Sequence, residues 1–288
     1  MRSFTLVGAG RLGTVLAAAL ARRGWRPELV VDTDARAARE ARRAIGAGRA
    51  SVSVRASSRL GETVLVAVPD TEIARVAAGL AASGVRWAGR TVLHTSGLQP
   101  ARLLAPLARR GALVASLHPV QSFARKDAPA SVFAGITWGV EGDPAAVETC
   151  ARIVRALRGR ILLLSEQDKP LYHAACSLAS NALVALEATA AGALRGIGIG
   201  GREAEAMLLP LVQGTLQNVK NLGLEKALTG PVLRGDVDTV RGHLEALGQD
   251  PEAREVYAVL GRRALGLAAK NGLPAGRVRA LKRLLGGG

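Results

Sequence analysis

The sequence has very little cysteine, methionine and aromatic side chain: two Cys, two Met, three Phe, three Trp and two Tyr among 288 residues. Two cysteines cannot form the disulfide framework of a small secreted domain, and Cys150 and Cys176 do not have metal-site spacing. We therefore expect reduced thiols, no bound metal and a cytoplasmic location.

Long hydrophobic runs are also missing. No apolar run reaches about 18 residues without a charge or a glycine, so no membrane span is expected. Met1 leads directly into a strand-like run, which leaves no room for a signal peptide. The composition, 49% apolar and 22% charged, is typical of a globular protein, and the length is sufficient for two domains.

Acidic residues are scarce, and the net charge of +16 is unevenly spread. Residues 1–164 carry 24 basic and 11 acidic side chains (+13), whereas residues 165–288 carry 15 and 12 (+3). Such a positive charge first suggests that the protein binds nucleic acid. The arginines are scattered, however, and no recognition motif is present, so we expect no nucleic-acid partner. A basic field that attracts phosphorylated cofactors and small anionic substrates fits better.

Short apolar runs alternate with helical patterns up to Leu164, and after that only helical patterns follow. Alternating strands and helices predict a Rossmann-type, doubly wound parallel α/β sheet, followed by an all-α domain. The expected domains are 1–164 and 165–288. The expected strands are 4–9, 28–32, 52–55, 63–69, 91–95, 112–118, 136–141 and 160–164, and the expected helices are 11–23, 34–44, 71–82, 100–109, 143–157, 168–195, 202–221, 236–247, 251–271 and 274–285.

A glycine-rich turn follows the first expected strand in "TLVGAGRLG". Gly8 permits the tight turn, Gly10 lets a pyrophosphate approach the backbone, and Gly13 lets the helix pack closely on the strand. The pyrophosphate would then lie at the positive end of the helix, beside Arg11 and Leu12. With a strand before it and a helix after it, this spacing predicts a dinucleotide site.

Different residues of this turn and of the following helix favour different nicotinamide cofactors. Asp32 closes the second strand, where a carboxylate binds the ribose hydroxyls of NAD and repels the 2′-phosphate of NADP. Arg11, Arg36 and Arg39 argue the other way, because a guanidinium clamps a phosphate. The cofactor is therefore NAD or NADP, with a slight preference for NAD.

The ends of later strands add polar residues at the same predicted edge. Val68 and Pro69 are expected to line the nicotinamide half of the site, and Asp70 to cap the following helix. "HTSG" supplies His94, for which a structural role is preferred, and Ser96, a candidate substrate contact.

"HPVQSF" supplies His118 and Gln121 at the end of another strand. Because the carboxyl ends of parallel strands share one crevice, these residues and Ser96 are expected to converge on one ligand. His118 fits a substrate contact and a loop scaffold equally well.

The stretch "DKPLYHAACSLASN" starts the helical half. With Pro170 in the first turn, Lys169, His173, Ser177 and Asn181 form a ladder of i+4 steps across one helix face. The positive helix end lowers the pKa of Lys169 and favours proton donation. A solvated face is the alternative, although the rest of the helix is apolar nearly all round.

A last polar cluster follows the break at Gly230 and Pro231. Asp236 is expected to cap the helix that begins after it. Arg234 fits two roles: a bidentate contact to a substrate carboxylate, or a structural pair with Asp236 or Asp238.

The order of the motifs along the chain resembles that of a known group of two-domain proteins. The motifs are the glycine turn, "VPD", "HTSG", "HPVQSF", "KPLYHAACSLASN", "NVKNLG" and "ALTGPVLRGD". They look like the 6-phosphogluconate dehydrogenase-like superfamily, which includes ketopantoate reductase. More narrowly, they resemble a little-characterised bacterial family that joins a Rossmann-like domain to a helical domain of unassigned function. The resemblance spans essentially the whole chain.

The resemblance implies roles for individual residues. Relatives carry a catalytic Lys on the helix after the Rossmann domain, with an Asn four residues later; Lys169 matches the first position and His173 replaces the second. Lys169 or His173 would then hand a proton to the substrate oxygen, and Ser96, His118, Gln121, Asn181 and Arg234 would complete the site. Thr33 stands where the narrow family has an Arg, so a preference for NADP does not carry over.

The resemblance also implies an NAD(P)-dependent oxidoreductase of small carboxylate-bearing substrates, acting on a CH–OH group. Ketopantoate is the best single expectation, and a homodimer is expected. "HP" at 118–119 is similar to the prephenate and arogenate dehydrogenases, and a pyrroline-5-carboxylate reductase-like activity stays open. The competing hypothesis is a nucleotide-binding sensor or scaffold without redox chemistry.

Overall fold

The computed structural model describes residues 2–55 and 57–286. The chain forms two compact units, Met1–Ser177 and Leu178–Gly288. Helix α6 (Lys169–Leu194) runs across the division between them. The domain boundary expected after residue 164 stays a prediction, because the first turns of α6 belong to the first unit.

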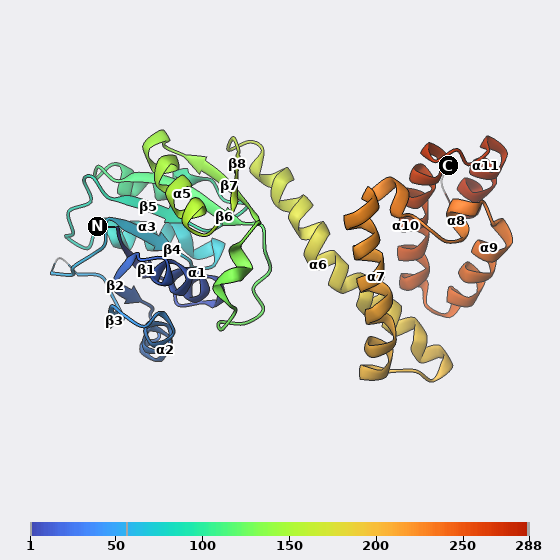
Figure 1. Ribbon diagram of the computed structural model, residues 1–288, viewed down its shortest axis with the longest axis horizontal. Coiled ribbons are helices and arrows are strands. Elements are labelled where there is room, and N and C mark those ends of the chain that lie inside the picture. Colours follow the sequence, from blue (N-terminus) through green and yellow to red (C-terminus); the bar gives the residue numbers. More distant parts are fainter. Residues whose placement is uncertain (1, 56, 287–288) are drawn as a thin grey trace. The chain divides into compact units, whose positions relative to one another are not determined.

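The first unit is built on an eight-stranded sheet in the order β3-β2-β1-β4-β5-β6-β7-β8 (Figure 1). The strand order reverses between β1 and β4, which is where ligands bind in open sheets of this kind. All predicted strands are present, except that the third lies at 49–51 and not at 52–55. The strands are β1 (Ser3–Val7), β2 (Arg26–Val31), β3 (Arg49–Ser51), β4 (Thr63–Val66), β5 (Thr91–His94), β6 (Leu113–Pro119), β7 (Thr137–Gly142) and β8 (Arg160–Leu163).

One strand pair departs from the expected parallel sheet, because β7 runs antiparallel to β6. Between these strands the chain forms only a short 3₁₀ turn, η3 (Ala130–Phe133), and no crossover helix. Without a helix the chain cannot return to the other end of the sheet, so β7 starts at the edge where β6 ended. Helix α5 (Pro144–Ala156) then restores a parallel crossover to β8.

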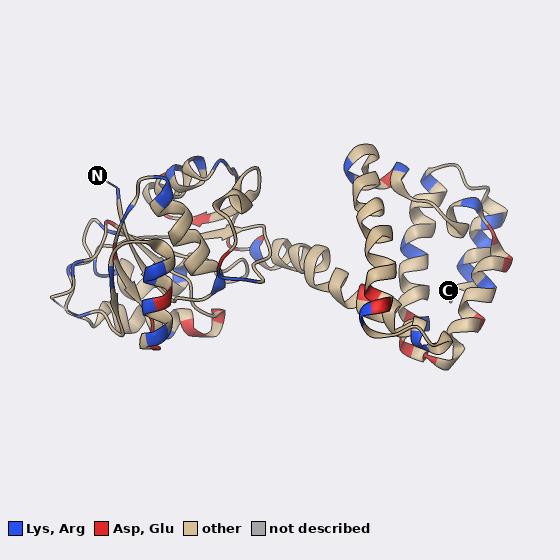
Figure 2. Ribbon diagram, turned by 60° about the horizontal axis from the view of Figure 1, so that its bottom comes forward, with Lys and Arg blue, Asp and Glu red and all other residues tan. Residues whose placement is uncertain are grey.

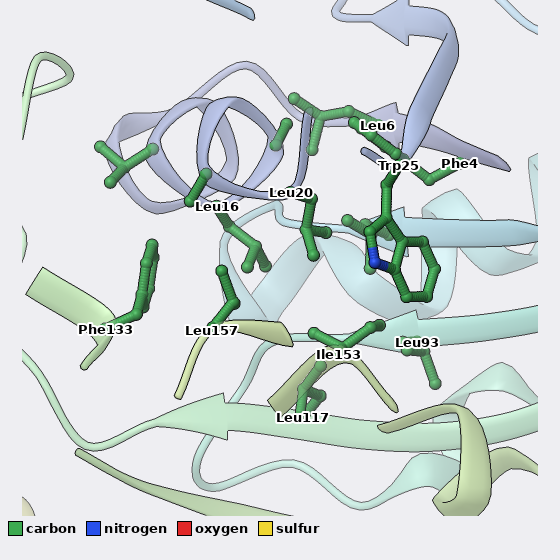
Figure 3. Close-up of a cluster of buried hydrophobic side chains, with 14 of the residues drawn as sticks. Phe4, Leu6, Leu16, Leu20, Trp25, Leu93, Leu117, Phe133, Ile153 and Leu157 are labelled. Atoms are coloured by element: carbon green, nitrogen blue, oxygen red, sulfur yellow. The ribbon is translucent and has the colours of Figure 1, made fainter. Parts of the chain in front are cut away.

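Successive strand residues enter two different cores. Leu6 and Leu93 belong to the core on one face of the sheet, together with Leu20 of α1 (Arg11–Arg22) and Ile153 of α5 (Figure 3). Leu65 belongs to the same core. The strand neighbours of these residues belong to the core on the other face, which includes residues of α3 (Ile73–Ala81) and α4 (Ala105–Ala108). A sheet covered on both faces explains why its strands are continuous apolar runs and not alternating ones. These neighbours are Val7, Val64, Val66 and Val92.

The remaining helical segments of the first unit follow the predicted order. They are α2 (Ala35–Ile45), η1 (Asp70–Glu72), α3 (Ile73–Ala81), η2 (Ala101–Leu104) and α4 (Ala105–Ala108).

The second unit is helical, as predicted. Its small core is formed by residues of the last four helices, α8 (Pro231–Arg234) to α11 (Ala275–Leu284), and of the turn after α11. Val240, Leu244 and Leu265 belong to it. Asp236 caps α9, as expected, through the backbone N–H of Thr239. The helical segments are η4 (Arg195–Ile197), α7 (Gly201–Ala227), α8 (Pro231–Arg234), α9 (Val237–Ala246), η5 (Leu247–Gln249), α10 (Pro251–Lys270) and α11 (Ala275–Leu284).

Helices α6 and α7 bury very few of their own side chains. Lys169 is the one buried residue among the described side chains of α6, and Ala204 and Ala227 are the buried ones of α7. Large apolar side chains are instead exposed, such as Leu178 at 71% and Leu211 at 68%. Figure 2 shows that α6 is almost free of charged residues.

The segment Lys169–Ile197, which contains α6, is long and apolar enough to cross a membrane by length and composition alone, with a mean hydropathy of 1.3. A core helix and a signal sequence pass the same test, but the most apolar window of this segment is 0% buried and lies far from the N-terminus. The expectation of no membrane span stays a prediction.

Candidate functional site

The turn after β1 has the geometry that the glycine pattern predicts. Gly8 has a φ of 97°, which favours glycine, and a Cβ atom added there would lie 2.3 Å from the Ala67 carbonyl oxygen. A Cβ atom at Gly13 would lie 2.4 Å from the Gly8 carbonyl oxygen. Side chains at either position would push α1 away from β1 and β4.

Gly10 differs from these two glycines because space beside it is open. A Cβ atom added at Gly10 would have the Ala67 oxygen, 4.0 Å away, as its nearest neighbour. Gly10 precedes α1, and no side chain caps the first N–H groups of that helix. Open space next to uncapped helix N–H groups is suited to the pyrophosphate of a dinucleotide.

A cavity of about 280 Å³ extends from this turn between the ends of β1, β2 and β4. Five predicted cofactor residues line it: Gly8, Gly10, Asp32, Val68 and Pro69. Arg11 and Leu12 lie on the first turn of α1 outside this lining, and their roles stay predictions.

Thr33, the position where the resembled family has an Arg, also lines the cavity. Val52, Glu72, Arg75 and Val76 line it as well and were missed. The sequence signal for Glu72 and Arg75 was their place on the helix that follows "VPD". Because the glycines and the acidic residue at the end of β2 are placed as this cofactor class requires, the residues fit a nicotinamide dinucleotide.

Asp32 stabilises the turn itself. One of its carboxylate oxygens accepts the Ala9 N–H at 2.8 Å, and the other accepts the Asp34 N–H at 2.9 Å. Asp34 caps α2 through the Arg36 N–H, while the Arg36 guanidinium pairs with Glu40 at 2.8 Å. The acidic groups at this end of the cavity are therefore held by the backbone, and Arg36 already has an acidic partner.

The expected role of Asp70 is wrong. Asp70 is the first residue of η1 and makes no capping hydrogen bond; its carboxylate instead accepts the Ser96 hydroxyl at 2.6 Å. The Ser96 oxygen in turn accepts the N–H groups of Leu98 and Gln99. Ser96 is thus buried and used to join the ends of β4 and β5, and its contact with substrate stays a prediction.

Lys169 is completely buried, with 0% of its surface exposed. Its amine donates to the Ser116 hydroxyl at 2.6 Å and to the Ser96 carbonyl at 3.3 Å. A Glu141 oxygen lies 4.0 Å from it.

Burial lowers the pKa of Lys169, while Glu141 and Asp70 oppose that shift. Burial, and not the positive helix end expected from the sequence, is the main cause of the lowered pKa of Lys169. An amine enclosed in this way reaches a ligand only through its neighbours, so proton donation by Lys169 stays a prediction.

Three ring side chains gather beside Lys169. The His118 Nδ1 and Tyr172 Oη atoms are 2.8 Å apart and share a hydrogen bond. The His118 and His173 rings meet edge to face, with centroids 5.7 Å apart. A Cβ atom added at Gly97 would lie 2.6 Å from His173 Nδ1 and 2.9 Å from His118 Nε2, so a glycine is needed between them.

Protonation states follow from this packing. Burial, together with the nearby His173 and Lys169, lowers the pKa of His118 to about 4, so His118 is neutral at physiological pH. Burial raises the pKa of Tyr172, so its phenol stays protonated. Tyr172 was not among the predicted site residues, although it lies on the same predicted helix.

The other predicted residues lie at different places. Gln121 is exposed in the loop after β6, where its own groups bond to Val132 and Ser122. Asn181 and Arg234 belong to the second unit, and Arg234 is exposed at the end of α8. The substrate-binding roles of these three residues stay predictions.

His94 is completely buried, and its burial makes the free energy of unfolding depend on pH. Burial lowers its pKa to about 4 from the ordinary value of 6.5. Between these values the unfolded chain binds more protons than the folded one, so the free energy of unfolding falls as the pH falls. We expect His94→Asn, which keeps an acceptor for the Ser96 N–H, to remove about 2 kcal/mol of that loss between pH ~6.5 and ~4.5.

The measurement is urea unfolding at these two pH values, followed by tryptophan fluorescence. All three tryptophans, Trp25, Trp87 and Trp138, lie in the first unit, so the signal reports on the unit that contains His94. Equal pH dependence in both proteins would show that folded His94 titrates near its ordinary pKa.

Solved structures with a similar fold were found for nearly the whole chain. BF3122 from Bacteroides fragilis, named as a candidate NADP oxidoreductase, is 25% identical, with 92% of this chain and 98% of that one covered and a TM-score of 0.73. TM1727 from Thermotoga maritima is 24% identical, with 93% and 99% covered and the same TM-score. A reductive aminase from Aspergillus terreus is 19% identical, with 99% and 92% covered and a TM-score of 0.60.

Family models match both parts of the sequence, whereas no curated protein matches it. Residues 2–119 match the Rossmann-like domain, and residues 136–264 match a domain of unknown function, DUF2520. These matches confirm the two-domain resemblance inferred from the sequence motifs. The chain is therefore a protein in which a Rossmann-like domain is followed by a DUF2520 domain.

Proposed function

We propose that this chain is an oxidoreductase that binds a nicotinamide dinucleotide at the Gly8–Gly13 turn and acts on a small carboxylate-bearing substrate. One observation carries the proposal: the first unit combines a turn shaped for pyrophosphate with a His118–Tyr172 pair at the end of another strand. The name of the B. fragilis protein supports this cofactor class.

The chain's own residues would hold the cofactor at one end. The N–H groups at the start of α1 bind the pyrophosphate, and the carboxylate of Asp32 faces the ribose. When bound, the nicotinamide supplies or accepts a hydride. The cavity beside Val68 and Pro69 gives the cofactor an apolar wall that excludes water.

His118 and Tyr172 would handle the proton that accompanies hydride transfer. Both side chains are only partly buried, whereas Lys169 has no exposed surface. The protonated phenol of Tyr172 can donate to a substrate oxygen, and neutral His118 can restore that proton as a relay: its Nδ1–H passes to the phenolate while its Nε2 accepts a proton from water. Lys169 then acts as a positioning residue that holds the ends of β5 and β6, and His173 completes the polar wall.

The substrate class follows from charge and resemblance. The excess positive charge of the first 164 residues favours anionic substrates. Among small carboxylate-bearing substrates, ketopantoate is the best single candidate, by resemblance. Prephenate, arogenate and imines belong in the same test panel, because structures of an arogenate dehydrogenase, a prephenate dehydrogenase and an imine reductase share the fold.

NAD is the proposed preference, because Asp32 and Asp34 would repel a 2′-phosphate. We expect NAD to raise the melting temperature by several degrees and NADP to raise it less. Gly10→Ala should weaken the NAD-dependent rise, since its methyl group occupies the space left for the phosphate. Gly79→Ala, which also adds a methyl group in open space, should leave the rise unchanged.

Thermal unfolding with and without each nicotinamide measures this prediction. No rise with either cofactor would contradict the proposed function. A larger rise with NADP would contradict the NAD preference alone.

The proton-handling pair can be separated from Lys169 by substitution. We expect Tyr172→Phe to lower kcat by about 10²–10⁴-fold while leaving the NAD-dependent thermal shift unchanged. Lys169→Met should instead lower the free energy of unfolding by about 3 kcal/mol, because Glu141 and Ser116 lose their buried partner.

Turnover of the substrate panel and urea unfolding decide between these roles. If Lys169→Met keeps its stability and loses turnover, Lys169 is the proton donor and the assignment to Tyr172 is wrong. If the unsubstituted protein binds NAD but turns over no substrate in the panel, a nucleotide-binding sensor is the better description.

We also propose that the protein forms a homodimer through α6 and α7. Both helices expose large apolar side chains, among them Leu178, Val184, Leu211 and Leu224. Large apolar side chains left exposed in this number point to an interface in a folded protein. A second copy presents the same two helices, so one self-complementary contact would cover both.

Leu211→Glu is expected to give a monomer by light scattering after size-exclusion chromatography. Leu98→Glu, which adds the same charge at an exposed apolar residue of the first unit, should leave the dimer intact. A monomeric unsubstituted protein, or one that sediments with phospholipid vesicles, would contradict the dimer.

A further inference from the structure

A second polar cavity lies at the opposite end of the sheet from the glycine turn. Its volume is about 290 Å³, and its lining includes Thr63 and Thr91, which start β4 and β5, and Arg2, just before β1. Thr149 and Arg152 of α5 complete one wall. The dinucleotide turn follows the carboxyl end of β1, so the two cavities are separate.

The charged groups of this cavity favour an anion. Arg2 and Arg152 both line it, and neither forms an ion pair within the described chain. Arg152 donates to the Thr149 hydroxyl at 2.7 Å, and the Arg2 guanidinium lies 5.8 Å from the centroid of the Trp25 ring. These contacts orient both guanidinium groups without neutralising them. Glu62 is the single carboxylate in the lining.

The hydroxyl groups of the cavity are buried and incompletely bonded. Thr63, Thr91 and Thr149 are 4%, 6% and 3% exposed. The Thr91 and Thr149 oxygens are 3.4 Å apart, a weak mutual hydrogen bond. Trp25 also lines the cavity and is 3% exposed, and its indole N–H is buried without a hydrogen-bond partner among the residues that the structure describes. A buried N–H donor at that place needs an acceptor that enters from outside.

We propose that this cavity binds a small phosphate-bearing anion. Two guanidinium groups and several threonine hydroxyls supply more donors than one carboxylate accepts, and they match the oxygens of a phosphate. The ring of Trp25 forms an apolar wall for the carbon atoms of a phosphate monoester, and Glu62 can accept from a hydroxyl of the same molecule. The site is independent of nicotinamide binding.

The three tryptophans provide a local probe for this binding. In ¹H–¹⁵N spectra we expect inorganic phosphate, added at constant ionic strength against chloride, to shift the Trp25 indole signal in a saturable way. The Trp87 and Trp138 signals should stay in place, because neither residue lines the cavity. Glycerol phosphate, as a second arm, binds more tightly if the natural ligand is a monoester and no more tightly if it is free phosphate.

A matched pair of arginine variants tests the assignment. Arg152→Gln should weaken phosphate binding by about tenfold or more, whereas Arg155→Gln, on the same helix with the same loss of charge, should change it less than about twofold. Thr63→Val, which keeps the side-chain shape, should weaken it by about fivefold.

Several outcomes would overturn the proposal. A Trp25 signal that does not move at tens of millimolar phosphate excludes the site. Equal weakening by Arg152→Gln and Arg155→Gln would mean that phosphate responds only to the general charge of the unit. The dispersion of the three indole signals shows in the same spectra whether each variant is folded.

Discussion

The buried ammonium group of Lys169 is the interaction on which the carboxyl edge of the sheet depends. A charge without solvent must be paired, so the amine keeps Ser116 of β6, the Ser96 carbonyl after β5 and Glu141 of β7 around it. This enclosure fixes where α6 starts. Residues three and four positions later lie on the same helix face, which places Tyr172 and His173 beside His118. The ring cluster therefore follows from the position of one amine.

Features that depend on local chain geometry could be predicted from the sequence. Continuous apolar runs gave the strands, because side chains such as Leu6 and Val7 are buried on opposite faces of the same sheet. The glycine turn could also be predicted, since Gly8 and Gly13 lie where a Cβ atom would clash with the backbone. Capping of α9 by Asp236 was also confirmed, because it involves only the following turn.

Features that depend on distant contacts could not be predicted. Asp70 had a local capping role available, but it accepts from Ser96, 26 residues away. The direction of β7 was decided by the lack of a helix after β6, which the spacing of strands does not reveal. Helical angles placed Lys169 and His173 on one face, yet they carry no information about what covers that face. For the same reason Tyr172 was missed.

The first and the later turns of helix α6 lie in different surroundings and need different side chains. Its first turns need polar groups, because Lys169 and Tyr172 are satisfied by the strand ends of the first unit. Its later turns, with Val184 and Leu186 exposed, need an apolar cover that their own chain provides only in small part. A helix gains most of its stability from packing and little from propensity. In the proposed dimer, the cover supplied by a second copy would therefore stabilise the same helix that carries Tyr172 and His173, which makes the order of the site depend on association.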